Sequence, residues 1–330
     1  MNMEGPGNGP FCFSVDRNSR GLNTAPMTHK NLALVLGGGG AAGNAWMIGV
    51  VAGLAEAGVD LTEIADLVIG TSAGANAAAQ VRSGTPPAAL LAATLAPPPV
   101  QTASQPRPPS PPRPMEAVFE QMRTISAAAT SQAELQRAMA AYGLASDASF
   151  GPEIAEQRRA LVARRLPSHA WPERPMLIVA VNAETGELAT FDRESGVELV
   201  DAATAAISLP GAGPTHSING TRYVSGGVRS VDNADLATGY RNVIVLSPFS
   251  GRTGPLPPGQ FEGLRRPPGA DLASEVEVLR NEGSRVEVIT PDADSRAAMG
   301  VNQMDLATRI PSARAGYEQG KREAARLANL

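Results

Sequence analysis

The fold of this chain is decided by two segments, Leu32-Ala-Leu-Val-Leu-Gly-Gly-Gly-Gly-Ala-Ala-Gly43 and Asp66-Leu-Val-Ile-Gly-Thr-Ser-Ala-Gly74. Each starts with a short apolar run, continues into glycines and then becomes rich in alanine. A short apolar run that ends at glycine is typical of a buried parallel strand. We therefore predict strand, glycine turn and helix twice in succession, with helices over Ala45–Ala57 and Ala73–Ser83. This order indicates an α/β fold, a parallel-rich central sheet flanked by helices.

The uncharged stretch Leu32–Ala55 could also be taken for a membrane span, because its 24 residues are long enough to cross a bilayer. It contains seven glycines, four of them consecutive at Gly37–Gly40, which favour a loop between a strand and a helix. The first 30 residues contain no apolar run of the length that an export signal needs. We expect a cytoplasmic protein, and peripheral contact with a membrane is left open.

Composition limits the classes of function. The chain has 330 residues, of which 43% are hydrophobic, and 28 basic against 32 acidic residues give a net charge of −4. A sizeable core is therefore expected, and a nucleic-acid partner is not, because such proteins carry a basic surplus. One cysteine and three histidines leave no disulfide framework and little material for a metal site, so we expect no metal.

We predict one domain over 31–330, preceded by a disordered tail over 1–30. Nine of the 18 residues in Pro97–Pro114 are proline, which indicates an extended linker. A helical insertion over 115–170 follows, and 251–269 forms a second Pro/Gly-rich loop. The expected elements beyond the first two strands are helices at Met115–Ala141, Pro152–Arg165, Val200–Ser208, Asp271–Glu282 and Ser312–Leu327, and strands at Met176–Val181, Leu188–Phe191, Arg241–Leu246 and Arg285–Thr290.

The segment Gly70-Thr-Ser-Ala-Gly74 fits the pattern Gly-x-Ser-x-Gly. Because it lies between a predicted strand and a predicted helix, it has the context of a nucleophile elbow. Such a turn exposes the serine oxygen, and the helix that follows stabilises negative charge at its N-terminus. Ser72 is therefore a candidate nucleophile, although a glycine-rich turn with an incidental serine gives the same five letters.

The glycines of Gly37–Gly43 let backbone N–H groups converge on an anion. Two chemistries need this arrangement, a phosphate cradle and an oxyanion hole for acyl transfer. Gly38-x-Gly40-x-x-Gly43 also matches the dinucleotide fingerprint, which requires an acidic residue at the end of the next strand. Asp60 has the right separation but precedes that strand, and no Gly-Lys-Ser/Thr follows for a Walker A loop.

Both motifs together, in this order, resemble the patatin-like phospholipase family. A third segment extends the resemblance through Ile207-Ser-Leu-Pro-Gly211, Ile218–Val224, Gly226-Gly-Val228 and Asn233-Ala-Asp-Leu-Ala237, so that it covers about Leu32 to Leu246. The resemblance implies that Ser72 is the acyl-accepting nucleophile. It also implies that the N–H groups of Gly38, Gly39 and Gly40 form the oxyanion hole, and that no cofactor is needed.

The chain departs from the family at the base. Patatin-like enzymes use a Ser–Asp dyad whose Asp opens Asp-Gly-Gly, and the matching triplet here is Ser225-Gly-Gly227. A serine hydroxyl has a pKa far above 7 and cannot accept the proton of another serine. The chain has been altered, has lost its base, or uses another group.

Three groups are candidates for this substitution. Asp232 lies seven residues past Ser225, but turn preferences favour a capping role for it. Asp235 is better explained as a structural residue that bonds to the backbone. His216 is chemically capable of accepting a proton, but nothing in the sequence aims it at Ser72.

The leading hypothesis is a serine acyl hydrolase that acts on lipid acyl esters and is impaired by the missing Asp. One alternative is a lipid-binding or interaction protein that keeps the fold without catalysis, and another is a dinucleotide-binding protein. A general α/β-hydrolase triad fits less well, because that fold places its His late and 114 residues follow His216. The expected partner is a lipid or acyl-ester substrate, while head group, chain length and oligomeric state are left open.

Overall fold

The computed structural model describes residues 31–97, 114–250, 267, 269 and 271–327. The predicted tail over 1–30, nearly all of the Pro-rich linker and nearly all of the 251–269 loop lie outside these residues.

One mixed sheet forms the centre of the molecule, with strand order β5-β6-β3-β2-β1-β7-β8 and β4 paired to β3. The strands are β1 Leu32–Leu36, β2 Leu67–Thr71, β3 Met176–Asn182, β4 Leu188–Phe191, β5 His216–Ile218, β6 Thr221–Ser225, β7 Asn242–Leu246 and β8 Arg285–Ile289. Strands β3, β2, β1, β7 and β8 run parallel, whereas β4, β6 and β5 pair antiparallel. The predicted α/β fold with a parallel-rich sheet is confirmed.

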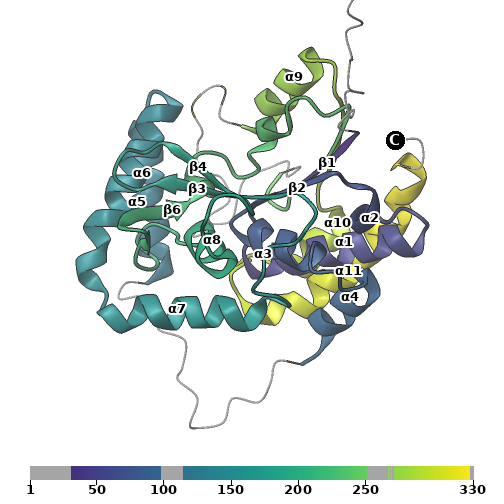
Figure 1. Ribbon diagram of the computed structural model, residues 1–330, viewed down its shortest axis with the longest axis horizontal. Coiled ribbons are helices and arrows are strands. Elements are labelled where there is room, and N and C mark those ends of the chain that lie inside the picture. The colour runs from purple at the N-terminus through teal and green to yellow at the C-terminus, as the bar shows by residue number, and fades with distance from the viewer. Residues whose placement is uncertain (1–30, 98–113, 251–266, 268, 270, 328–330) are drawn as a thin grey trace, which may run out of the picture.

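Helices cover both faces of the sheet (Figure 1). They are α1 Gly40–Glu56, α2 Leu61–Ile64, α3 Ala73–Val81, α4 Pro87–Leu95, α5 Met115–Ala128, α6 Gln132–Ser146, α7 Pro152–Arg165, α8 Leu199–Ala206, α9 Leu272–Asn281, α10 Ala293–Met299 and α11 Arg309–Leu327. The face formed by Leu32, Leu34 and Leu36 packs on α1, α3 and α8, and the opposite face packs on α9. No helix in the described part of the chain combines the length and apolarity of a membrane span.

Two predicted helices differ from the structure. Helix α1 begins at Gly40, five residues before the predicted Ala45, because the first-turn amide of Ala42 is satisfied from outside the helix by the Gln303 carbonyl oxygen at 3.0 Å. The predicted helix Met115–Ala141 is two helices, since Ser131 interrupts it and caps α6 by accepting from the Glu134 N–H at 3.2 Å.

The long helices α1 and α11 cross at very short distance. A Cβ placed at Gly49 would lie 2.2 Å from the Ala313 carbonyl oxygen, and one at Gly320 would lie 2.3 Å from the Val50 carbonyl oxygen. Such distances are too short for any side chain, so glycine is required on both helices. This contact fixes α1, whose first turn carries the glycine loop, between the sheet and α11 (Figure 1).

A hairpin that we did not predict brings position 225 to the sheet. Strands β5 and β6 are joined at Asn219 and Gly220, whose φ angles are 52° and 84°. Both positive values are those of a type I′ turn, and Asn-Gly is its preferred dipeptide. The strand β6 then pairs with β3 and ends at Ser225.

Candidate active site

Ser72 occupies the turn between β2 and α3, in a strained backbone conformation with φ 54° and ψ −118°. A non-glycine residue rarely adopts a positive φ, and when it does the position is commonly functional. The glycines on either side are needed for space, because a Cβ at Gly74 would lie 1.9 Å from the Leu36 carbonyl oxygen and one at Gly70 2.6 Å from the Gly74 carbonyl oxygen. Ser72 itself is half-buried and directly follows the last residue of β2.

The glycine loop after β1 lies beside Ser72. In the parallel pair of β1 and β2, Leu36 is opposite Gly70, so the two strands end together. A Cβ placed at Gly38 would lie 3.7 Å from the Ser72 Cβ. The two glycine turns found in the sequence therefore meet at one edge of the sheet, where an α/β fold forms its sites.

The amide hydrogens of this loop are not equivalent. The Gly38 N–H donates to the Val231 carbonyl oxygen at 2.8 Å, so it is engaged, in contrast to the role that the resemblance implied for it. The N–H groups of Gly39 and Gly40 donate to no group among the described residues. They lie at the N-terminus of α1, where amides lack intrahelical partners and favour negative charge. The geometry provides two donors, Gly39 and Gly40.

Two neighbouring segments hold the loop in place. A Cβ at Gly39 would lie 2.6 Å from the Pro248 Cβ. On the other side, a Cβ at Gly40 would lie 2.7 Å from the Gln303 carbonyl oxygen and 2.8 Å from the Met304 sulfur. Side chains at these positions would displace the loop, which explains the run of glycines.

Ser225 lies at the end of β6, buried and two strands from the elbow. Its partner across the strand pair is Ala180, and the preceding residue of β3, Val179, is paired with Thr71. Two strand spacings separate backbones by about 10 Å. The Ser225 Oγ accepts from the Gly227 N–H at 3.2 Å, a bond that stabilises the following turn.

Of the three candidate substitutes for the missing base, Asp232 is the one that contacts the glycine loop and the residue before Ser72. Its side chain is buried, and Oδ1 lies 2.1 Å from a Cβ placed at Gly37, so the carboxylate packs against the start of the glycine loop. Its carbonyl oxygen accepts from the Thr71 hydroxyl at 3.2 Å, and Thr71 directly precedes Ser72.

Asp235 is held in an ion pair. Its two carboxylate oxygens accept from Arg229 Nη1 at 3.0 Å and Nη2 at 2.5 Å. Hydrogen bonding to Asp235 raises the pKa of Arg229. These contacts support the structural role expected of Asp235.

His216 lies on β5, with β6 and β3 between it and β2. Its Nε2 lies 2.9 Å from Asp201 Oδ1, an oxygen that also accepts from Arg159 Nε at 2.6 Å. Burial lowers the pKa of His216 from its ordinary value, against the opposing effect of Asp201. The described contacts of His216 therefore lead away from Ser72.

The sequence analysis missed the role of Asn233. It is fully buried and left-handed, with φ 54°, and its Nδ2 donates to the Thr71 hydroxyl at 3.0 Å and to the Ser230 carbonyl oxygen at 2.7 Å. The amide thus links the Asp232 loop to the elbow strand. An asparagine is among the few residues that adopt this conformation, but nothing in the sequence identifies its partner.

Neither a dinucleotide site nor a metal site is supported among the described residues. Asp60 caps α2, its Oδ1 accepting from the Thr62 N–H at 2.9 Å, while the strand that follows ends in Thr71 and Ser72. No group of three or more His, Cys, Asp or Glu side chains in the described ranges could hold a metal ion.

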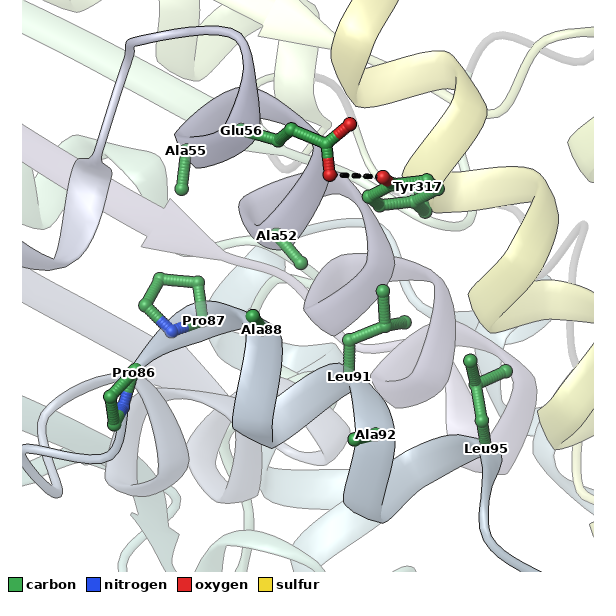
Figure 2. A pocket seen from close by; sticks show the side chains of 10 residues that line it. All are labelled: Ala52, Ala55, Glu56, Pro86, Pro87, Ala88, Leu91, Ala92, Leu95 and Tyr317. Atoms are coloured by element: carbon green, nitrogen blue, oxygen red, sulfur yellow. Dashed lines mark hydrogen bonds between the residues drawn. The ribbon is translucent and has the colours of Figure 1, made fainter.

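A groove of about 540 Å³ lies between α4, the C-terminal end of α1 and α11 (Figure 2). Its lining is mostly alanine, proline and leucine, and its polar groups Glu56 and Tyr317 are hydrogen-bonded to each other. Glu56 is sixteen residues from Gly40 along α1, which corresponds to about 24 Å. The groove is therefore separate from the Ser72 turn.

A search of curated protein sequences finds no match. Among solved structures, the crystal structure of the type III effector protein ExoU is similar at 17% identity and a TM-score of 0.31, over 88% of this chain and 54% of that one. The chain thus spans about half the length of that protein. A family model described as patatin-like phospholipase matches residues 34–238, more than half of the chain. The chain, with both glycine turns, Ser72 and Ser225 inside the matched range, belongs to the patatin-like phospholipase family.

Proposed function

We propose that this protein is a serine hydrolase of lipid acyl esters, with Ser72 as nucleophile and the N–H groups of Gly39 and Gly40 as oxyanion donors. The observation that carries this function is the juxtaposition of the strained serine turn with the glycine loop, 3.7 Å between the Ser72 Cβ and a Cβ placed at Gly38. Membership of the family supports a lipid acyl ester as the substrate class.

The proposed reaction is an acyl transfer. Ser72 Oγ attacks the ester carbonyl carbon, and the carbonyl oxygen gains negative charge beside Gly39 and Gly40. The ester C–O bond then breaks, the alcohol leaves, and an acyl-enzyme remains. Water attacks this intermediate, which releases the fatty acid and regenerates the serine.

The proton of Ser72 needs an acceptor, and Ser225 cannot serve because a hydroxyl is not basic at neutral pH. We propose that the protein is consequently slow, and that Asp232 is the group that takes over part of this role. Asp235 and His216 are already engaged with Arg229 and Asp201. Asp232 packs against the start of the glycine loop, and its carbonyl oxygen accepts from the hydroxyl of Thr71, the residue before Ser72.

Turnover of a short-chain p-nitrophenyl ester, together with labelling by a fluorophosphonate, tests the function. The Ser72→Ala variant should lose both the label and the turnover, whereas Ser195→Ala, an exposed serine after β4, should lose neither. Equal turnover by the Ser72→Ala variant would exclude the proposed nucleophile. Labelling without any turnover, even after a carboxylate is restored at position 225, would favour the non-catalytic lipid-binding alternative.

A further inference from the structure

Three exposed apolar side chains lie together between α10 and α11. Val301, Met304 and Leu306, here called the apolar edge, are 64%, 46% and 54% exposed. Elsewhere in the described ranges, the only large apolar residues of comparable exposure are Ile64, Leu188 and Val278, which are scattered on separate elements. Single exposed apolar residues are ordinary, but a group of three in six residues indicates contact with a partner.

The apolar edge adjoins the candidate active site. The Gln303 carbonyl oxygen accepts from the Ala42 N–H at 3.0 Å, which ties the segment to the first turn of α1. The sulfur of Met304 would be 2.8 Å from a Cβ at Gly40, one of the two free amide donors. A partner that covers the apolar edge would therefore lie next to the amide donors of the glycine loop.

Three arginines, here called the arginine cluster, lie where α7 ends and α11 begins, close to this edge: Arg164, Arg165 and Arg309. Arg164 and Arg165 lie in the last turn of α7. Arg309 begins α11, three residues after Leu306. The start of α11 lies next to the C-terminal end of α7 (Figure 1). The pKa of Arg165 is lowered chiefly by its partial burial. The positive charges of Arg309 and Arg164 lower it further.

The arginine cluster has no acidic partner among the described residues. The neighbouring Arg159, by contrast, forms ion pairs with Glu198 and Asp201. Three uncompensated cations in one place on a chain of net charge −4 point to an anionic partner.

We propose that the apolar edge and the arginine cluster together dock on a bilayer that contains anionic phospholipids, and so present its esters to Ser72. The apolar side chains would enter the boundary between head groups and acyl chains, while the arginines contact phosphate groups. The carboxylate of Asp305, within the edge, caps the following turn by accepting from the Ala307 N–H at 2.9 Å. The assignment of a lipid as the docked surface rests on the proposed function.

Sedimentation of the full-length protein with vesicles tests this surface. At 0.1 M NaCl the protein should bind vesicles of phosphatidylcholine and phosphatidylglycerol (3:1) more tightly than phosphatidylcholine alone, and 0.5 M NaCl should weaken that binding. The double variant Arg165→Gln/Arg309→Gln and the double variant Val301→Ser/Leu306→Ser should each weaken it by about tenfold or more.

Matched variants control for charge and apolar area. Arg193→Gln/Arg241→Gln removes two exposed arginines that form no ion pair in the described structure, and Ile64→Ser/Val278→Ser removes two side chains of 48% and 46% exposure. Both controls should bind like the unaltered chain. The proposal is overturned if the unaltered chain does not bind these vesicles, if either test variant binds equally well, or if the controls weaken binding as much.

The ester assay separates this proposal from the proposed function. All of these variants should turn over a soluble short-chain ester at the rate of the unaltered chain, because Ser72 and the glycine loop are unchanged. Vesicle binding with the expected dependence but no ester turnover would support the surface and contradict the hydrolase. Ester turnover without vesicle binding would contradict the surface alone.

Discussion

At the scale of single residues, Ser225 is the position at which the proposed catalytic mechanism can be tested most directly. Ser225 is the last residue of β6 and precedes two glycines, at the position where the sequence resemblance implies an aspartate. Its hydroxyl only accepts a hydrogen bond from the Gly227 N–H. The proposed mechanism thus combines a nucleophile, Ser72, and two oxyanion donors with a hydroxyl group that cannot accept a proton.

Replacement of Ser225 by Asp should therefore increase turnover. Positioned proton transfer typically contributes about 10²–10⁴-fold, so kcat/KM for a short-chain ester should rise at least about tenfold in Ser225→Asp. The exposed Ser217→Asp variant on β5 adds the same charge away from the site and should not change the rate. An unchanged rate in Ser225→Asp would mean that the site lacks more than its base.

Asp232 provides the second prediction at this scale. If its carboxylate takes part of the proton transfer, Asp232→Asn should lower the residual turnover by about tenfold, the low end of the range above. The substitution keeps the shape of a side chain that packs against Gly37, so the melting temperature serves as the check on folding. The exposed Asp294→Asn should leave turnover unchanged, and an Asp232→Asn variant that matches it would exclude Asp232 as an acceptor.

At the scale of elements, the crossing of α1 and α11 supports the site. Helix α1 begins with the glycine loop and is buried along most of its length, so its position depends on how closely α11 can approach. Because a Cβ at Gly53 would lie 2.1 Å from the Tyr317 carbonyl oxygen, no methyl group fits between the helices.

The Gly53→Ala variant should accordingly be less stable, although alanine is the better helix former. Overpacking of this kind costs about 1–3 kcal/mol, and urea denaturation should show that loss in the free energy of unfolding. Glu277→Ala, exposed on α9, should change it by less than about 0.5 kcal/mol. A Gly53→Ala variant as stable as the unaltered chain would show that the two helices can separate without cost.

At the scale of the whole molecule, His216 couples folding to pH. Burial lowers its pKa in the folded state from the ordinary value of 6.5, so the unfolded chain takes up a proton first as the pH falls. Since the unfolded state then binds more protons, the stability contributed by neutral His216 is present above pH 6.5 and is lost as the pH falls through the folded-state pKa.

The free energy of unfolding should thus decrease between pH 7 and pH 5.5, and His216→Gln should flatten that slope. Urea denaturation at several pH values gives the measurement. The exposed His169→Gln provides the control and should keep the slope of the unaltered chain. If both variants keep the same slope, another group is responsible for the pH dependence.

The sequence by itself determined the elements around the site. Strands β1 and β2, the glycine turns after them and helix α3 are local, because apolar runs, glycines and alanines set backbone preference within a few residues. The position of Ser72 between β2 and α3 follows from the same local pattern. The family resemblance also came from the sequence, since its motifs are short and follow one another in order.

Only the tertiary structure decided which groups these elements meet. The Gly38 amide is engaged by Val231, and His216 pairs with Asp201, although neither partner is marked by a sequence pattern. The arginine cluster likewise forms because α11 begins beside the end of α7, far apart in the chain. Hydrogen bonds and charge contacts reach only a few ångströms, so they depend on how distant segments pack, and that packing is a property of the whole chain.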